Sequence, residues 1–136
     1  MPRVTIVTAT RGRPEELERA LRSAVEQDFE DFEHLVVDDA SPDASAQEVA
    51  DRVGDRRVRV IRLPESRGPA GARNAALAEA RGTYVAILDD DDLMAPGRLA
   101  KSVAFLDTHA DCALVAGAFR AIDAAGQTLA VVRPPT

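Results

Sequence analysis

Short runs of β-branched and aliphatic residues alternate along the chain with longer segments of helical periodicity. Two neighbouring parallel strands must be joined by a crossover long enough to hold a helix, so this alternation is typical of a mostly parallel sheet with helices packed on its faces. We therefore predict an α/β fold with a central sheet flanked by helices. The expected strands cover residues 4–8, 33–37, 57–63, 84–88, 113–119 and 129–132, and the expected helices cover residues 14–27, 44–53, 72–80 and 96–109.

Local patterns predict details of this sheet and its connections. Residues 84–88 read YVAIL, an unbroken apolar run that is typical of the buried centre of a parallel sheet. The segment 64–71 is rich in Gly and Pro and predicts a loop. Residues 124–127 read AAGQ, which predicts a hairpin turn before the last expected strand.

The length of 136 residues suffices for one domain with a single core, so we expect one domain over residues 1–136. Seventeen basic and 23 acidic residues leave a formal charge of −6, which opposes non-specific attraction to nucleic acid or an anionic membrane. The single cysteine excludes a disulfide within the chain, and no apolar run approaches the roughly 18 residues of a transmembrane helix. We expect a cytoplasmic protein with no transmembrane segment and no nucleic-acid partner, in which homo-oligomer formation stays open.

Polar clusters follow three of the expected strands. They are TATR at residues 8–11, the aspartate pair at 38–39 and the four aspartates at 89–92. In an open α/β sheet the carboxyl ends of the strands line the ligand crevice. The three clusters therefore predict one shared site.

The four consecutive aspartates at 89–92 are the most informative of these clusters. Their carboxylates repel one another after a buried strand, and a divalent ion would relieve that repulsion. Mg²⁺ and Mn²⁺ commonly take one or two protein carboxylates and complete their shells with water and phosphate oxygens, which suits a diphosphate ligand. The alternative is a solvated acidic loop in which Asp91 or Asp92 caps the next helix.

Asp38 and Asp39 follow the apolar triplet at 35–37. Adjacent strand residues point to opposite faces, so one carboxylate can face the crevice while the other bonds to the loop. A carboxylate placed there can accept hydrogen bonds from ribose hydroxyls or from a base N–H. The alternative is an Asx-type turn built by residues 38–42.

The segment 67–74 combines two arginines, flexible backbone and the start of a helix. Guanidinium groups and helix N-terminal amides both favour phosphate. The segment lacks the Lys-Ser or Lys-Thr of a Walker loop and the Gly-x-Gly-x-x-Gly of a dinucleotide fold. A plain helix-entry loop is an equally good interpretation of this segment alone.

Taken together, four phrases resemble the family 2 glycosyltransferases of the GT-A fold, in order and in spacing. The resemblance covers residue 3 to about residue 125 and implies a Rossmann-like nucleotide-diphospho-sugar transferase domain. It also implies that the chain, or a longer parent protein, transfers a sugar from a nucleoside diphosphate sugar to a hydroxyl acceptor with inversion. The phrases are TATRGRP at 8–14, VVDDAS at 36–41, RGPAGARNAAL at 67–77 and ILDDDDL at 87–93.

By the same resemblance, Thr10 and Asp39 hold the nucleoside, while Arg73 and Arg67 lie near the diphosphate of a UDP-, dTDP- or GDP-sugar. The usual aromatic-Asn pair is replaced by Arg11 and Gly12. Arg11 would either stack on the base or reach phosphate, which leaves the nucleotide open. A second departure is Ala40, which stands where the family usually has Gly.

Within the aspartate run, the resemblance makes Asp91 the ligand of Mn²⁺ or Mg²⁺ and places Asp89 near the ribose or the donor sugar. The additional Asp90 allows a register shifted by one residue, so it belongs to the expected donor site as well.

No catalytic base is evident. The base of this family comes from a segment well past the aspartate motif, and the carboxylates at 107, 111 and 123 lack its local context. We therefore expect either the donor half of a longer protein or a truncated relative. A nucleotide-binding or metal-binding module without turnover is the alternative class, and a phosphatase-like α/β domain is disfavoured because its acidic nucleophile should follow the first strand, where TAT stands.

Overall fold

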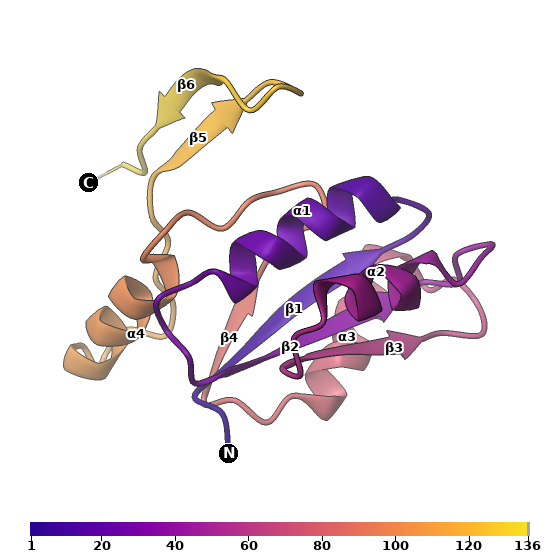
Figure 1. The fold of residues 1–136 in the computed structure, drawn as a ribbon. Coiled ribbons are helices and arrows are strands. Elements are labelled where there is room, and N and C mark those ends of the chain that lie inside the picture. The colour runs from indigo at the N-terminus through magenta and orange to yellow at the C-terminus, as the bar shows by residue number, and fades with distance from the viewer. Residues whose placement is uncertain (136) are drawn as a thin grey trace. The chain divides into compact units, whose positions relative to one another are not determined.

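The computed structural model describes residues 1–135 and shows two compact units, one over Met1–Ala100 and one that begins at Lys101. The first unit carries a four-stranded sheet of order β3-β2-β1-β4, in which every neighbouring pair is parallel (Figure 1). The predicted α/β fold with a parallel sheet is thus confirmed. In chain order the elements are β1 (Val4–Thr10), α1 (Pro14–Val25), β2 (Phe32–Asp38), α2 (Ser45–Val53), β3 (Val58–Arg62), α3 (Gly68–Glu79), β4 (Tyr84–Ile87), α4 (Arg98–Thr108), β5 (Phe119–Ile122) and β6 (Thr128–Val132).

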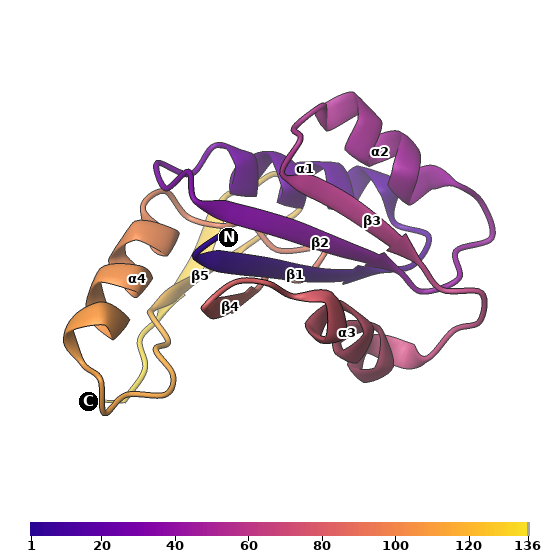
Figure 2. The ribbon, with the colours of Figure 1, turned by 90° about the horizontal axis from the view of Figure 1, so that it is seen from below.

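Helices cover both faces of this sheet. Because strand side chains alternate between faces, Leu35 and Val37 of β2 pack against α3 while Val36 packs against α1 and α2. Figure 2 shows α1 and α2 above the sheet and α3 below it. The two middle strands, β1 and β2, are almost wholly buried, as expected for strands with a partner on each side and a helical layer on each face.

Helix boundaries follow local chemistry. Helix α1 begins at Pro14, whose ring suits the first turn, and carries Glu15 and Glu16 near its positive end. At the end of α2, Gly54 adopts a left-handed φ of 68°. Helix α3 begins at Gly68, four residues before the predicted start. The prediction of a loop over residues 64–71 was therefore wrong for residues 68–71, which are helical. Pro69 in the first turn starts the helix inside that Gly- and Pro-rich segment.

Two strand predictions were wrong. Strand β4 pairs only with β1 among the described residues and lies at the edge of the sheet, with Val85 44% and Ile87 41% exposed, rather than at its buried centre. A strand was also predicted over 113–119, but residues 113–118 form none and the strand begins at Phe119. The segment ALVAGA at 113–118 contains mostly Ala and Gly, which have low strand propensity.

The predicted hairpin near the end of the chain is confirmed. Strands β5 and β6 pair antiparallel, with an irregularity in register between Ala121 and Ile122. Asp123 stabilises the turn because its carboxylate accepts hydrogen bonds from the backbone N–H groups of Ala125 and Gln127, each at 2.9 Å.

Across the described residues 1–135, no helix has the length and apolar character needed to cross a membrane. The expectation of a single domain over the whole chain is not tested by the division into two compact units and stays a prediction.

Candidate functional site

The carboxyl ends of β1, β2 and β4 bring the three polar clusters to one edge of the sheet. Thr10 is in register with Asp38, and the N–H of Asp39 donates to the carbonyl oxygen of Thr10 at 2.9 Å. On the other side of β1, the hydroxyl of Thr10 donates to Asp90 at 2.9 Å. The structure therefore places residues from all three clusters next to one another.

Asp39 accepts hydrogen bonds from the N-terminus of α3. Its carboxylate accepts hydrogen bonds from the N–H of Arg67 at 2.7 Å, the N–H of Gly68 at 3.0 Å and the hydroxyl of Ser66 at 2.8 Å. Burial alone would raise the pKa of Asp39, but these three bonds together with the charge of Arg11 lower it below its ordinary value. Two of the backbone N–H groups at the start of α3, those of Arg67 and Gly68, are thus bound by a carboxylate of the protein rather than left for phosphate.

Arg11 is connected to this arrangement through one hydroxyl. Its NH1 donates to Ser66 Oγ at 3.3 Å, and Ser66 in turn donates to Asp39. Arg11 is exposed and follows the carboxyl end of β1. Arg67 contributes its backbone N–H here, while its side chain is exposed.

Asp38, which is almost completely buried, organises the loop that follows β2. Its Oδ1 accepts from the N–H of Ser41 at 2.9 Å, and its Oδ2 accepts from Arg62 at 3.0 Å. Two residues after Asp38, Ala40 has a left-handed φ of 57°. It is the only non-glycine residue with positive φ in the described part of the chain. That conformation explains why a glycine suits position 40 and shows that alanine is strained there.

Asp90 turns inward from the acidic run, with 7% of its surface exposed. It accepts the Thr10 hydroxyl and lies 3.5 Å from NH1 of Arg13. Burial raises the pKa of Asp90, and the neighbouring charges of Asp91 and Asp89 raise it further, against the opposing effects of Thr10 and Arg13. Asp90 therefore lies in the interior of the site, where it contacts Thr10 and Arg13.

Asp89, Asp91 and Asp92 form a second arrangement, in which one carboxylate oxygen of each lies within 4.8 Å of the others. A turn closed by the bond from the N–H of Asp92 to the carbonyl oxygen of Asp89, 3.1 Å long, brings them together. The side chains of Asp89 and Asp91 are 49% and 55% exposed, and each meets one guanidinium: Arg73 at 2.8 Å and Arg13 at 3.3 Å.

Burial raises the pKa of Asp92, and the charges of Asp91 and Asp89 raise it further, against the opposing charge of Arg98. Oxygen-only carboxylate ligands that solvent can reach suit Mg²⁺ or Mn²⁺, which keep water and substrate oxygens in their shells. The residues present therefore fit a divalent ion.

Among the expected site residues, Thr10, Arg11, Asp39 and the backbone of Arg67 are connected directly or through Ser66. Arg73 donates to Asp89, which follows β4. Both groups lie at the carboxyl edge of one sheet, and the residues that would serve each expected role remain predictions.

Sequence reasoning missed three contributors. Arg13 contacts the acidic run, Ser66 connects Arg11 with Asp39, and Asp92 belongs to the carboxylate group. The spacing of the group offered a signal for Asp92, because residues i, i+2 and i+3 of a tight turn can converge. No pattern in the sequence singled out Ser66.

Known proteins resemble this chain over most of its length. A family model described as glycosyl transferase family 2 matches residues 5–130. The succinoglycan biosynthesis protein ExoO of Rhizobium meliloti (strain 1021) is 44% identical over 103 residues, which are 76% of this chain and 29% of that protein. An Escherichia coli protein, UDP-Glc:alpha-D-GlcNAc-diphosphoundecaprenol beta-1,3-glucosyltransferase WfaP, is 31% identical over 109 residues, 80% of this chain and 43% of the relative.

Solved structures agree with this similarity. The S. aureus TarS 1-349 structure in complex with UDP-GlcNAc aligns with a TM-score of 0.71 at 32% identity, covering 81% of this chain and 32% of that one. The mannosyltransferase PcManGT from Pyrobaculum calidifontis, in complex with GDP-Man and Mn²⁺, aligns with a TM-score of 0.70 at 35% identity over 77% of this chain and 32% of its own. The chain spans less than half the length of these relatives and structural neighbours.

Proposed function

Because this chain belongs to glycosyl transferase family 2, we propose that it is the nucleotide-sugar-binding domain of a glycosyltransferase that uses a divalent metal ion. In this proposal residues 1–136 act as one domain that holds the donor, and a hydroxyl group of an acceptor receives the sugar with inversion. The residue that serves as base is not assigned to this chain.

The observation that carries the proposal is the group formed by Asp89, Asp91 and Asp92. One oxygen of each carboxylate lies within 4.8 Å of the others, yet among residues 1–135 one guanidinium contacts Asp89 and one contacts Asp91. A carboxylate group that serves only the fold would be expected to have its oxygens satisfied by protein donors, as those of Asp39 are.

The metal ion belongs at this group. Asp91 is the ligand we expect, with Asp89 and Asp92 close enough to share the ion or to hold its water molecules. Mn²⁺ or Mg²⁺ bound there would neutralise the charge that develops on the leaving diphosphate. Arg73 lies beside Asp89, so its guanidinium can turn to a phosphate oxygen once the ion has taken over the carboxylate.

The nucleoside belongs on the other side of β1, around Thr10 and Asp39. Asp39 accepts three hydrogen bonds and retains capacity for a further one, because a carboxylate offers about four acceptor positions. A base N–H or a ribose hydroxyl could donate to that position. The neighbours were solved with UDP-GlcNAc and with GDP-Man, so uracil and guanine nucleotides are the first candidates.

Donor binding tests this assignment directly. We expect at least one of UDP-glucose, UDP-GlcNAc, dTDP-glucose and GDP-mannose to bind the chain in the presence of Mn²⁺, measured by calorimetry. Replacement Arg73→Gln should weaken that binding about tenfold by removing a charge-assisted bond to phosphate. Arg19→Gln, which changes an exposed arginine of α1, is the matched control and should bind like wild type.

Two results would contradict the proposal. One is that no nucleotide sugar binds with Mn²⁺ present. The other is that Arg73→Gln and Arg19→Gln bind the donor equally well, which would remove the diphosphate from this edge of the sheet.

A further inference from the structure

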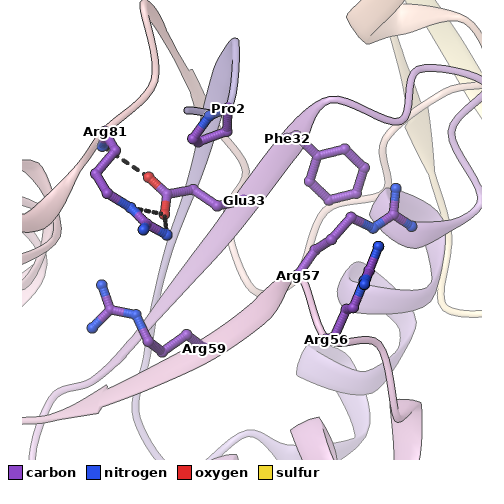
Figure 3. A pocket seen from close by; sticks show the side chains of 7 residues that line it. All are labelled: Pro2, Phe32, Glu33, Arg56, Arg57, Arg59 and Arg81. Carbon is purple, nitrogen blue, oxygen red and sulfur yellow. Dashed lines mark hydrogen bonds and ion pairs between the residues drawn. The ribbon is translucent and has the colours of Figure 1, made fainter.

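A hollow of about 280 Å³ lies at the amino edge of the sheet, away from the site described above, and we call it the arginine pocket (Figure 3). Glu33, which lines the pocket, lies near the start of β2, whereas Asp39 of the candidate donor site follows the end of that strand. Six residues of extended chain separate them by roughly 20 Å. The pocket therefore cannot share a small ligand with the candidate donor site. Its lining consists of Pro2, Phe32, Glu33, Arg56, Arg57, Arg59 and Arg81.

The lining is strongly cationic in a chain whose net charge is −6. Four guanidinium groups face one carboxylate, and two further carboxylates, Asp55 and Glu79, contact the guanidinium groups from outside the lining. Within the lining itself the guanidinium groups outnumber the carboxylates by three, and Asp55, Glu79 and Glu30, whose charge acts on Arg57, lie outside it. The positive charge is thus a local feature of this hollow.

Two members of the lining are fully engaged in holding the fold. Arg57 donates to Asp55 at 2.7 Å and stacks over the ring of Phe32 at 4.1 Å. Glu33 accepts from the hydroxyl of Thr5 and from both the backbone and the guanidinium of Arg81, and these bonds outweigh burial and lower its pKa. Glu33 is therefore an ionised, saturated neighbour that holds the guanidinium of Arg81 in place.

Three guanidinium groups retain unused donors. Arg56 is exposed and makes no hydrogen bond within residues 1–135, while its charge acts on Asp55. Arg59 donates through NH1 to Glu79 at 2.6 Å, which leaves its Nε and NH2 groups. Arg81 uses Nε and NH2 on Glu33, which leaves NH1. Figure 3 shows Arg59 and Arg81 on one side of the pocket and Arg56 on the other.

We propose that the arginine pocket binds a diphosphate group, either as the inorganic anion or as part of a larger molecule, and without a metal ion. Planar guanidinium forks match phosphate oxygens in pairs, and donors on opposite sides of the hollow require an anion that spans it. The volume of about 280 Å³ leaves room for an anion larger than a single phosphate.

The test is a titration of the isotope-labelled chain with inorganic pyrophosphate in the presence of a chelator, followed by NMR. We expect shifts of the signals of Arg56, Arg59 and Arg81. Arg56→Gln and Arg59→Gln should each raise the dissociation constant about tenfold, because each removes a charge-assisted hydrogen bond. Arg19→Gln on α1 should leave it unchanged, and inorganic phosphate should bind at least about tenfold more weakly than pyrophosphate.

Arg56→Gln breaks no hydrogen bond within the described residues, so loss of binding in this variant reports on the pocket rather than on folding; circular dichroism checks this. The proposal is overturned if Arg56→Gln and Arg59→Gln bind pyrophosphate as tightly as Arg19→Gln. Shifts confined to residues 66–73 would likewise assign the anion to the donor site instead. Equal affinity for phosphate and pyrophosphate would overturn the diphosphate assignment.

Discussion

The two aspartate runs of this chain, 38–39 after β2 and 89–92 after β4, follow parallel strands of the same sheet and end in opposite environments. In the first run, both carboxylates are buried and accept hydrogen bonds from backbone N–H groups and side chains. In the second, only Asp90 is buried, and the other three carboxylates converge near solvent with two guanidinium groups in contact.

Acidic residues at strand ends can thus serve two purposes. Where several protein donors bind the carboxylate, as at Asp39, the pKa is lowered and the charge helps to hold a loop. Where carboxylates lie close together, as at Asp92, burial and then the neighbouring charges raise the pKa, and a divalent cation would relieve the repulsion. We therefore expect the first run to matter for stability as well as binding, and the second for binding alone.

The largest expected effect is on metal-dependent binding. Asp91→Asn should weaken Mn²⁺-dependent binding of a nucleoside diphosphate at least about 100-fold, since changes even outside the ligand shell commonly cost 10–100-fold. Urea unfolding should show no loss of stability, because the side chain is exposed and its removal relieves repulsion. Asp28→Asn, at an exposed position, is the control. Loss of stability on the scale expected for Asp39 would erase the contrast between the runs.

The next effect concerns stability. Asp39→Ala should lower the free energy of unfolding by about 2 kcal/mol, because it leaves the N–H groups of Arg67 and Gly68 and the hydroxyl of Ser66 without their acceptor. Urea denaturation of the variant beside wild type measures this. A variant as stable as wild type would mean that the hydrogen bonds from Asp39 to the N-terminus of α3 do not stabilise the fold.

A smaller effect of opposite sign is expected at Ala40. Its φ of 57° suits glycine, so Ala40→Gly should raise the free energy of unfolding by about 0.5–1 kcal/mol, the relief of strain exceeding the entropy cost of a glycine. Thermal and urea unfolding report it. Gly54→Ala, at a glycine with φ of 68°, is the complementary variant and should destabilise. Destabilisation by Ala40→Gly would mean that the loop is not strained.

The smallest effect is a pH dependence. Because the pKa of Asp39 is lowered in the fold, its ionised form stabilises the protein above the ordinary Asp value of about 4, and this contribution is lost as pH falls through the lowered pKa. The stability difference between wild type and Asp39→Asn should therefore stay constant from about pH 7 to 5 and shrink below about pH 4. A difference that grows on acidification would reverse the sign of the shift.

Much of the fold was predictable, because alternating strand and helix patterns determine an α/β arrangement through local periodicity. The edge position of β4 was not, since an apolar run such as 84–88 carries no information about how many strands pair with it. The start of α3 was missed because Gly and Pro near 68–71 suit both a loop and a first helical turn.

The location of the candidate site was predictable from the sequence, but most of its side-chain contacts were not. Strand-end positions and the resemblance to a family brought Thr10, Asp39 and the acidic run to one edge. Which aspartate turns inward depends on packing: Asp90 meets a buried Thr10 from a strand 80 residues away in the sequence. The contact of Arg13 with Asp91 is equally distant along the chain, and periodicity does not report it.

We expect the exposed carboxylates at 89–92 to hold a divalent ion together with the diphosphate. Calorimetric titration of UDP or GDP, whichever binds, with Mn²⁺ and with a chelator tests it most directly. We predict that Mn²⁺ tightens nucleotide binding at least about tenfold, and that the nucleotide tightens Mn²⁺ binding by the same factor, as linkage requires. Equal nucleotide affinity with Mn²⁺ and with chelator would contradict the claim.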